Sequence, residues 1–188
     1  MNGLDLGIVG LIRDVREGDL SQMLEWRNAP KVRENMYSQH EITLTEHLAW
    51  WEKIKLSQTD RYFIFELNSK PLGVVAFNDI DVLNNTAFWA FYSSPEAPRG
   101  TGSRMETLAL EYCFSFLGLH KLCCEVLEFN KAVVRLHKKF GFVEEGFFRD
   151  QRRIGSQYVG VYRLAIVSSQ WAALRSRFIS MFDPEIEK

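Results

Sequence analysis

The chain has 188 residues, a formal net charge of −1 and an apolar fraction of 46%. A chain of this size and composition can bury a core as one globular domain without a disulfide or a metal. The near-neutral charge and the lack of a long basic run argue against nucleic acid as a partner. No apolar stretch approaches the roughly 18 residues that cross a bilayer, and residues 1–12 do not resemble a signal peptide. A cytoplasmic protein without a membrane partner is therefore expected.

The three cysteines are expected to be buried free thiols. Their odd number in a reducing compartment argues against a disulfide framework. Cys123 and Cys124 are adjacent in a strand-like run, so they point to opposite faces and cannot easily share a metal. With Cys113, they are expected to pack as small hydrophobic residues. No metal site is expected.

The first half of the chain mixes helix and strand patterns. The elements expected there are, in chain order, a strand at 11–15, a helix ending at Asn28, a helix at 46–56, a hairpin of strands at 62–67 and 72–78, and a central strand at 86–92. Asp19 or Ser21 is the expected cap of the first helix, and Thr43 or Thr45 the cap of the second. The apolar side of the second helix is expected to carry Leu48, Trp51 and Leu56.

The second half alternates strands and helices more regularly. A loop at 93–102 leads to a helix of about sixteen residues that ends at Gly118. The elements expected after it are a strand at 121–127, a helix at 131–140, strands at 142–145 and 158–166, and a C-terminal helix at about 168–180, capped by Ser168 or Ser169. The whole order predicts a mixed, mostly antiparallel α/β sheet with helices on both faces, formed by one domain over residues 1–188.

A glycine-bearing loop stands immediately before the helix that follows the central strand. It reads Arg99-Gly100-Thr101-Gly102-Ser103. Glycines let the backbone approach a ligand closely, and a helix N-terminus offers unpaired N–H groups that favour phosphate. The Walker A and Rossmann patterns are both absent. The loop alone leaves two interpretations open: a phosphate site, or a turn before a helix.

Glu125 and His137 are the two candidate proton-transfer residues. Alternation along the strand at 121–127 places Glu125 on one face with Cys123 and Leu127. A carboxylate there needs either a functional cleft or a structural partner such as Lys121, Lys138 or an arginine elsewhere. His137 lies on the apolar stripe of the helix at 131–140, a position typical of a core histidine, although an imidazole there can also carry a proton.

These residues together resemble the GCN5-related N-acetyltransferase superfamily. The loop at 99–103 resembles its pyrophosphate-binding motif, and Glu125, Asn130, His137 and Gly141-Phe142 resemble its second half. The resemblance implies two central strands that splay apart, acetyl-CoA as co-substrate, and direct attack of an amine on the thioester. It places Glu125 as general base and His137, where a Tyr usually stands, as general acid. The residues that it places at acetyl-CoA are Phe91, Tyr92, Ser93, Arg99, Gly100, Thr101, Gly102, Ser103, Arg104, Asn130 and Lys138.

A closer resemblance is to the N-acetyltransferases of pseudaminic acid biosynthesis. The segments that carry it include Trp26-Arg27-Asn28, Met36-Tyr37, Glu46-His47-Leu48, Ala97-Pro98-Arg99-Gly100 and Leu136-His137-Lys138-Lys139. It implies transfer of acetyl to the 4-amino group of a UDP-linked amino-dideoxy sugar that serves flagellin glycosylation. The expected acceptor-binding residues are Asn28, Met36, Tyr37, His47 and Trp51, and Arg152-Arg153 either faces a diphosphate or forms a solvated surface pair.

Two other functions stay open. The first is an acetyltransferase with the same chemistry that acts on protein N-termini, a ribosomal protein or a small amine. The second is a non-catalytic module that binds acyl-CoA. The expected partners in the main interpretation are small molecules, and a homodimer is one assembly that the sequence allows.

Overall fold

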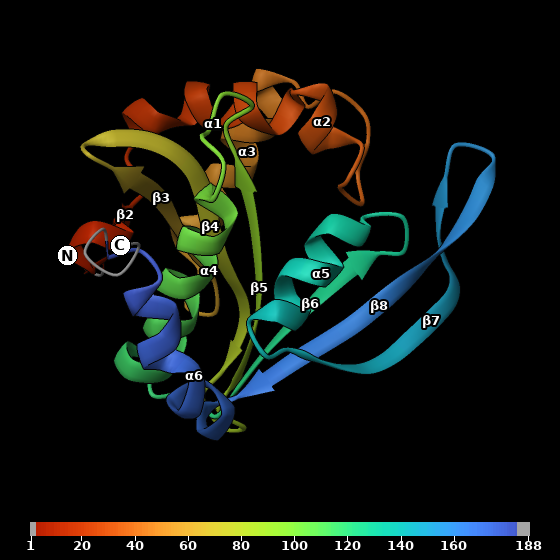
Figure 1. Cartoon of the computed structure of the whole chain (residues 1–188). Coiled ribbons are helices and arrows are strands. Elements are labelled where there is room, and N and C mark those ends of the chain that lie inside the picture. Colours follow the sequence, from red (N-terminus) through yellow and green to blue (C-terminus); the bar gives the residue numbers. More distant parts are fainter. Residues whose placement is uncertain (1–2, 184–188) are drawn as a thin grey trace.

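The computed structural model describes residues 3–183, whose centre is a mixed eight-stranded sheet (Figure 1). The strands are β1 (Leu4–Asp5), β2 (Leu11–Asp14), β3 (Arg61–Leu67), β4 (Lys70–Asp81), β5 (Thr86–Ser93), β6 (Lys121–Leu127), β7 (Val143–Ile154) and β8 (Gln157–Val167). They lie in the order β1-β2-β3-β4-β5-β6-β8-β7. Only the β5–β6 pair is parallel. The predicted mixed, mostly antiparallel sheet is confirmed.

Helices cover both faces of this sheet. They are α1 (Leu20–Asn28), α2 (Pro30–Arg33), α3 (Leu44–Ile54), α4 (Thr101–Glu111), α5 (Lys131–Lys139) and α6 (Ser168–Ser180). A π-helical turn, Tyr112–Phe116, continues α4, and two 3₁₀ turns, Gly7–Val9 and Glu17–Asp19, flank β2. Figure 1 shows α1, α2 and α3 gathered together, apart from α4 and α6.

Alternation along β3 divides the apolar residues into two main cores. Phe63 and Phe65 pack into the larger core, which α4 and α6 cover with residues such as Met105 and Trp171. Ile64 points to the opposite face and joins the smaller core with Trp26 of α1. Because successive strand residues face opposite sides, one strand supplies both cores. The aromatic content of the chain therefore serves mainly to fill the two layers.

The helix caps predicted from the sequence are confirmed only in part. Thr43 caps α3 as predicted, because its side chain accepts from the Glu46 N–H while Glu46 bonds back to the Thr43 N–H. Asp19 precedes α1 without a capping bond, since its carboxylate pairs with Arg13 at 2.7 Å. The predicted serine cap of α6 is wrong: Gln170 instead accepts from the N–H of Val167 at 2.9 Å.

The predicted apolar side of α3 is right for Trp51 and wrong for the two leucines. The side chains of Leu48 and Leu56 are exposed. The helix instead turns His47, Trp50 and Trp51 toward the protein, where the two tryptophans pack against the smaller core. Aromatic rings bury more area than the leucines would, so they decide which face turns inward.

Strands β7 and β8 form an arm that is much longer than the sequence predicts. Figure 1 shows this hairpin extending away from the rest of the molecule. Most residues of β7 are exposed, and β7 is the edge strand of the sheet. A strand exposed on both faces lacks the alternation that identifies strands, so only its first residues, 142–145, were recognisable.

All three cysteines are buried and unpaired, as predicted. Among residues 3–183, no helix combines the length and apolarity that crossing a bilayer requires.

Candidate active site

The site begins where the two parallel strands separate. Strands β5 and β6 pair at Thr86↔Lys121, Ala87↔Leu122 and Phe88↔Cys123, and the ladder stops there. Both strands continue, β5 to Ser93 and β6 to Leu127, and a cleft of about 450 Å³ opens between their ends. Beyond Phe88 the edge of β5 that faces β6 has no strand partner, so its backbone N–H and C=O groups are available to a ligand.

The cleft receives residues from both strands and from the segments around them. The residues that sequence analysis placed there and that do line it are Met36, Tyr37, Phe91, Tyr92, Ser93, Glu125, Asn130 and His137. Asn130 also caps α5, because its side-chain oxygen accepts from the Val133 N–H at 3.3 Å. Burial raises the pKa of the Tyr92 phenol well above its ordinary value, so the phenol stays protonated.

The N-terminus of α4 lies beside this cleft. Gly100 stands at its N-cap with φ of +93°, a conformation that other residues rarely adopt. A Cβ at Gly102 would lie 3.3 Å from Leu136 and 3.7 Å from the Phe91 ring, so the first turn packs closely on a cleft residue. Helix geometry leaves the first N–H groups of α4 without intrahelical partners, although that of Thr101 bonds the Pro98 carbonyl at 3.2 Å. The turn can therefore offer N–H groups to a phosphate.

Two cations expected at the co-substrate lie elsewhere. The Arg104 guanidinium bonds the carbonyls of Ile8 and Val9 and stacks on the Phe182 ring. Lys138 forms an ion pair with Glu144 at 2.8 Å, on the side of α5 that faces the arm. Neither residue lines the cleft. Arg99 is exposed in the loop before α4, at the helix N-terminus.

Glu125 has two partners in the cleft. One carboxylate oxygen accepts from the Tyr37 hydroxyl at 2.7 Å, and the other lies 3.4 Å from Nη1 of Arg163, its register partner on β8. Burial, and then the hydrogen bond to Glu125, raises the pKa of Tyr37. Arg152 of the arm stacks on the Tyr37 ring at 4.1 Å, so the arm reaches this end of the cleft. The arginine partner is Arg163, one of the alternatives that the sequence left open.

His137 lies at the inner wall of the cleft. Its side chain is 3% exposed, and its Nδ1 lies 2.8 Å from a carboxylate oxygen of Glu106 on α4. The rings of Trp89, Phe91 and Phe142 surround it at centroid distances of 5.3, 6.0 and 5.1 Å. Sequence analysis missed Glu106, because a lone glutamate on an amphipathic helix is normally solvated.

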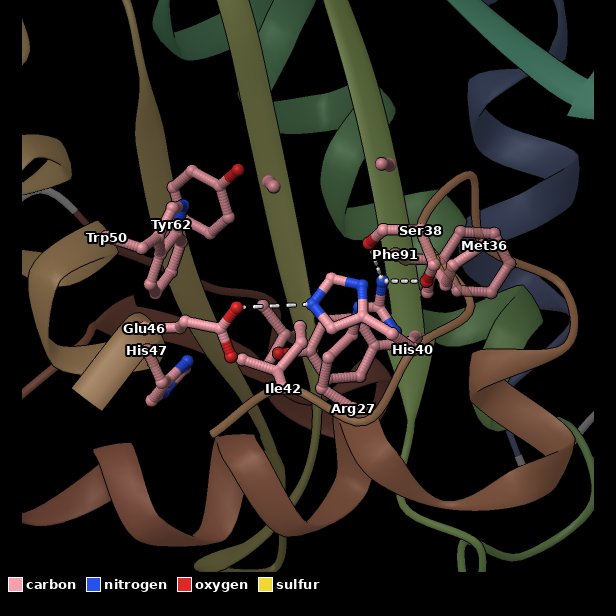
Figure 2. Close-up of a pocket in the computed structure, with 14 residues that line it drawn as sticks. Arg27, Met36, Ser38, His40, Ile42, Glu46, His47, Trp50, Tyr62 and Phe91 are labelled. Atoms are coloured by element: carbon pink, nitrogen blue, oxygen red, sulfur yellow. Dashed lines mark hydrogen bonds and ion pairs between the residues drawn. The ribbon is translucent and has the colours of Figure 1, made fainter. Parts of the chain in front are cut away.

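A second pocket, which we call the aromatic pocket, adjoins the cleft and is shown in Figure 2. Its volume is about 420 Å³. It is lined by Arg27, Met36, Ser38, His40, Ile42, Glu46, His47, Trp50, Tyr62, Val74, Ala76, Ala90, Phe91 and Tyr92. Six of these also line the cleft: Arg27, Met36, Ser38, Ala90, Phe91 and Tyr92. The two spaces therefore meet at β5 and at the segment after α2.

The walls of the aromatic pocket are flat rings with few charges. His47 stacks on Trp50 at 5.1 Å, and Trp50 meets the Tyr62 ring edge-on at 5.0 Å. Burial lowers the pKa of His47, which favours its neutral form. Arg27 donates to Ser38, while Glu46 lies 3.4 Å from His40 (Figure 2).

Not every predicted acceptor residue reaches this pocket. The Asn28 side chain forms hydrogen bonds with the N–H and the C=O of Ile42 and thereby fixes the segment after α2. Trp51 packs against the smaller core. Of the two adjacent tryptophans of α3, Trp50 lines the pocket and Trp51 does not. Arg27 is the main lining residue that sequence analysis did not single out, because an arginine on a surface helix carries no distinguishing signal.

No cluster of metal-binding side chains occurs in the part of the chain that the structure describes. The groups present suit an anionic, elongated organic ligand instead. The α4 N-terminus and the unpaired edge of β5 offer N–H groups, and aromatic and aliphatic side chains line the cleft. This combination defines the class of acyl-coenzyme A-dependent acyltransferases, in which the thioester lies between two splayed strands.

Comparison with known proteins agrees with that class. Residues 11–143 match the family described as "Acetyltransferase (GNAT) domain". The chain is 26% identical to spermidine N(1)-acetyltransferase of Escherichia coli (strain K12) over 163 residues, 86% of this chain and 88% of that protein. The corresponding enzyme of Vibrio cholerae is 26% identical over 85% of this chain and 94% of its own length.

A solved structure shows the same relationship in space. The crystal structure of the Vibrio cholerae spermidine N-acetyltransferase in complex with CoA and spermine superposes with a TM-score of 0.81, at 25% identity over 86% of this chain and 96% of that one. The chain belongs to the GNAT acetyltransferase family. It is an N-acetyltransferase, and acetyl-CoA is the co-substrate that fits its site.

Proposed function

We propose that the enzyme acetylates a primary amine of a small molecule that binds in the aromatic pocket. The observation that carries the proposal is that two small-molecule-sized spaces, of about 420 and 450 Å³, meet at shared residues, and that Glu125 lines the second of them. Pockets of this size suit compact ligands. A protein N-terminus would need an open groove, so the small-amine alternative is preferred over protein substrates.

Glu125 is the proposed general base. It removes a proton from the ammonium group, directly or through water, so that the neutral amine can attack the carbonyl carbon of the thioester. The C–N bond then forms, and N–H groups on the free edge of β5 stabilise the oxyanion. The N–H of Ser94, the residue that follows β5, is not available to the oxyanion, because it donates to the Leu72 carbonyl at 2.8 Å.

His137 is the proposed proton donor. When the C–S bond breaks, the electron pair leaves with sulfur, and a proton from the imidazole converts the thiolate to a thiol. A second proton leaves the attacking nitrogen, so the products are an amide, free CoA and one released proton. The placement of His137 on the cleft wall supports this role.

Two kinds of small amine are candidates for the acceptor. The names of the relatives favour a polyamine. The resemblance to the pseudaminic acid enzymes favours an amino-sugar nucleotide, but these relatives lend that acceptor no support.

One observation in the aromatic pocket does favour an anionic acceptor. Arg27 keeps a buried Nη1 without a hydrogen-bond partner among residues 3–183, whereas the carboxylate of Glu46 is half exposed and faces His40. A half-buried guanidinium with a free N–H is a donor for phosphate or carboxylate oxygens. A polycation would instead need carboxylates in the lining.

The test is release of free thiol from acetyl-CoA with an amine panel: spermidine, spermine, a UDP-linked 4-amino sugar and an N-terminal peptide. Turnover with a small amine and none with the peptide is expected; the peptide as best substrate would overturn the proposal. Arg27→Ala separates the two small amines. It should abolish turnover of a sugar nucleotide and spare that of a polyamine, and Arg149→Ala, at an exposed position on β7, is the matched control.

A further inference from the structure

Glu106 is a charged residue inside the core. Its side chain is fully buried on α4, and a carboxylate in such a place is costly unless it is paired. One oxygen lies 2.8 Å from Nδ1 of His137, and the other has no partner among the described residues. A helix position that could hold leucine therefore keeps a carboxylate with a single polar contact.

The contact with Glu106 decides which ring nitrogen of His137 is left for the cleft. Aromatic rings enclose the imidazole, and Glu106 is the polar partner of Nδ1. The nitrogen left for the cleft that His137 lines is Nε2. A lone neutral imidazole exists as two tautomers, only one of which carries its hydrogen on Nε2.

One proton shared between Glu106 and Nδ1 removes this ambiguity. If the proton is on the carboxyl group, it is donated to Nδ1 and the hydrogen of the neutral ring is on Nε2. If it is on Nδ1, the ring is an imidazolium and Nε2 again carries a hydrogen. The pair lies fully inside the protein, where a net charge is costly, and burial raises the pKa of Glu106; both favour the form of the pair that holds this proton and carries no net charge.

We propose that Glu106 is a positioning residue that keeps Nε2 of His137 protonated and directed at the sulfur of the leaving CoA. The proposal rests on the role of His137 in the proposed function. In the step, the N–H bond of Nε2 breaks, the proton forms the S–H bond, and the electron pair stays on the ring. The shared proton ends on Nδ1, Glu106 is left ionised, and water returns one proton after the thiol departs.

The groups that face the pair do not replace this proton source. Cys124 on β6 interacts with Glu106, but burial keeps the pKa of its thiol well above 9.0. Lys139 on α5 interacts with Glu106 through its charge alone. The rings of Trp89, Phe91 and Phe142, which surround His137, carry no titratable group.

Two measurements test the proposal. Long-range ¹H–¹⁵N spectra of the wild-type enzyme should show Nε2 of His137 protonated and Nδ1 bonded to Glu106 at pH 7; an unprotonated Nε2 overturns the proposal without any variant. In Glu106→Gln, kcat should fall about tenfold or more, because part of the roughly 10²- to 10⁴-fold acid–base contribution is lost. KM for acetyl-CoA should change little.

A double-variant comparison separates positioning from structure. His137→Tyr supplies a phenol that needs no partner to hold its proton, so adding Glu106→Gln to it should leave kcat unchanged. An equal loss in both backgrounds would mean that Glu106 acts only on the fold. His137→Phe at wild-type turnover would overturn the role of His137 and this proposal with it. Absence of thiol release with every amine would instead contradict the proposed acceptor class.

Discussion

Replacement of Glu125 by glutamine is the most direct test of the proposed chemistry. Glutamine keeps the length of the side chain and can still accept from the Tyr37 hydroxyl, which lies 2.7 Å from the Glu125 carboxylate. It cannot take a proton from the substrate ammonium group. The change therefore removes the base while leaving the shape of the cleft nearly intact.

The expected loss is large and confined to turnover. General acid–base groups contribute about 10²- to 10⁴-fold, which corresponds to about 2.7–5.4 kcal/mol of the barrier at 1.36 kcal/mol per tenfold. Acetyl-CoA affinity should change little, because the N–H donors at the α4 N-terminus are untouched. The deficit should shrink as the pH approaches about 10, where an alkylamine loses its own proton without help.

The assay is thiol release at saturating substrates, with calorimetry for acetyl-CoA affinity. Glu128→Gln, outside the cleft lining, is the matched control for charge, and Tyr37→Phe tests the hydrogen bond while retaining the base. Glu125→Gln with turnover within about threefold of wild type, far below the general-base range, would show that Glu125 is structural and paired with Arg163.

Three further predictions concern the co-substrate site, the proton donor and stability. Gly102→Val should weaken acetyl-CoA binding at least about tenfold, or 1.4 kcal/mol, since even a Cβ would lie 3.3 Å from Leu136; unchanged affinity in a folded variant refutes this. His137→Phe should lower turnover and His137→Tyr should retain much of it, whereas equal rates per folded molecule would make His137 a core residue. Asp19→Asn should lower stability at pH 7. Burial alone would raise the pKa of Asp19, but the bonds from Arg13 and from the Arg16 N–H together outweigh it and lower that pKa. The stabilisation is thus present above the ordinary value of 3.8 and fades as the pH falls through the lower folded pKa; a difference in melting temperature that persists in acid contradicts this pairing.

The sequence by itself determined the class of fold and pointed to the segments that form the candidate site. The strand at 121–127, the helix at 131–139 and the glycine-bearing loop carry local signals: alternation, a capping asparagine, and glycines before an amphipathic helix. These signals depend on neighbours along the chain, so they can be recognised without a structure. The family resemblance that these segments carry implied that Glu125 and His137 belong to one site, and both residues line the cleft.

Only the tertiary structure decided which side chains meet across that cleft. The Tyr37–Glu125 bond joins residues far apart in the chain, and so does the Glu106–His137 pair. Which of the two tryptophans of α3 lines the pocket depends on how their rings pack against α1 and β3. Arg104 and Lys138 are held away from the cleft by partners in the 3₁₀ turn Gly7–Val9 and in β7, respectively. Contacts of this kind arise from burial and charge pairing between distant segments, and no local periodicity encodes them.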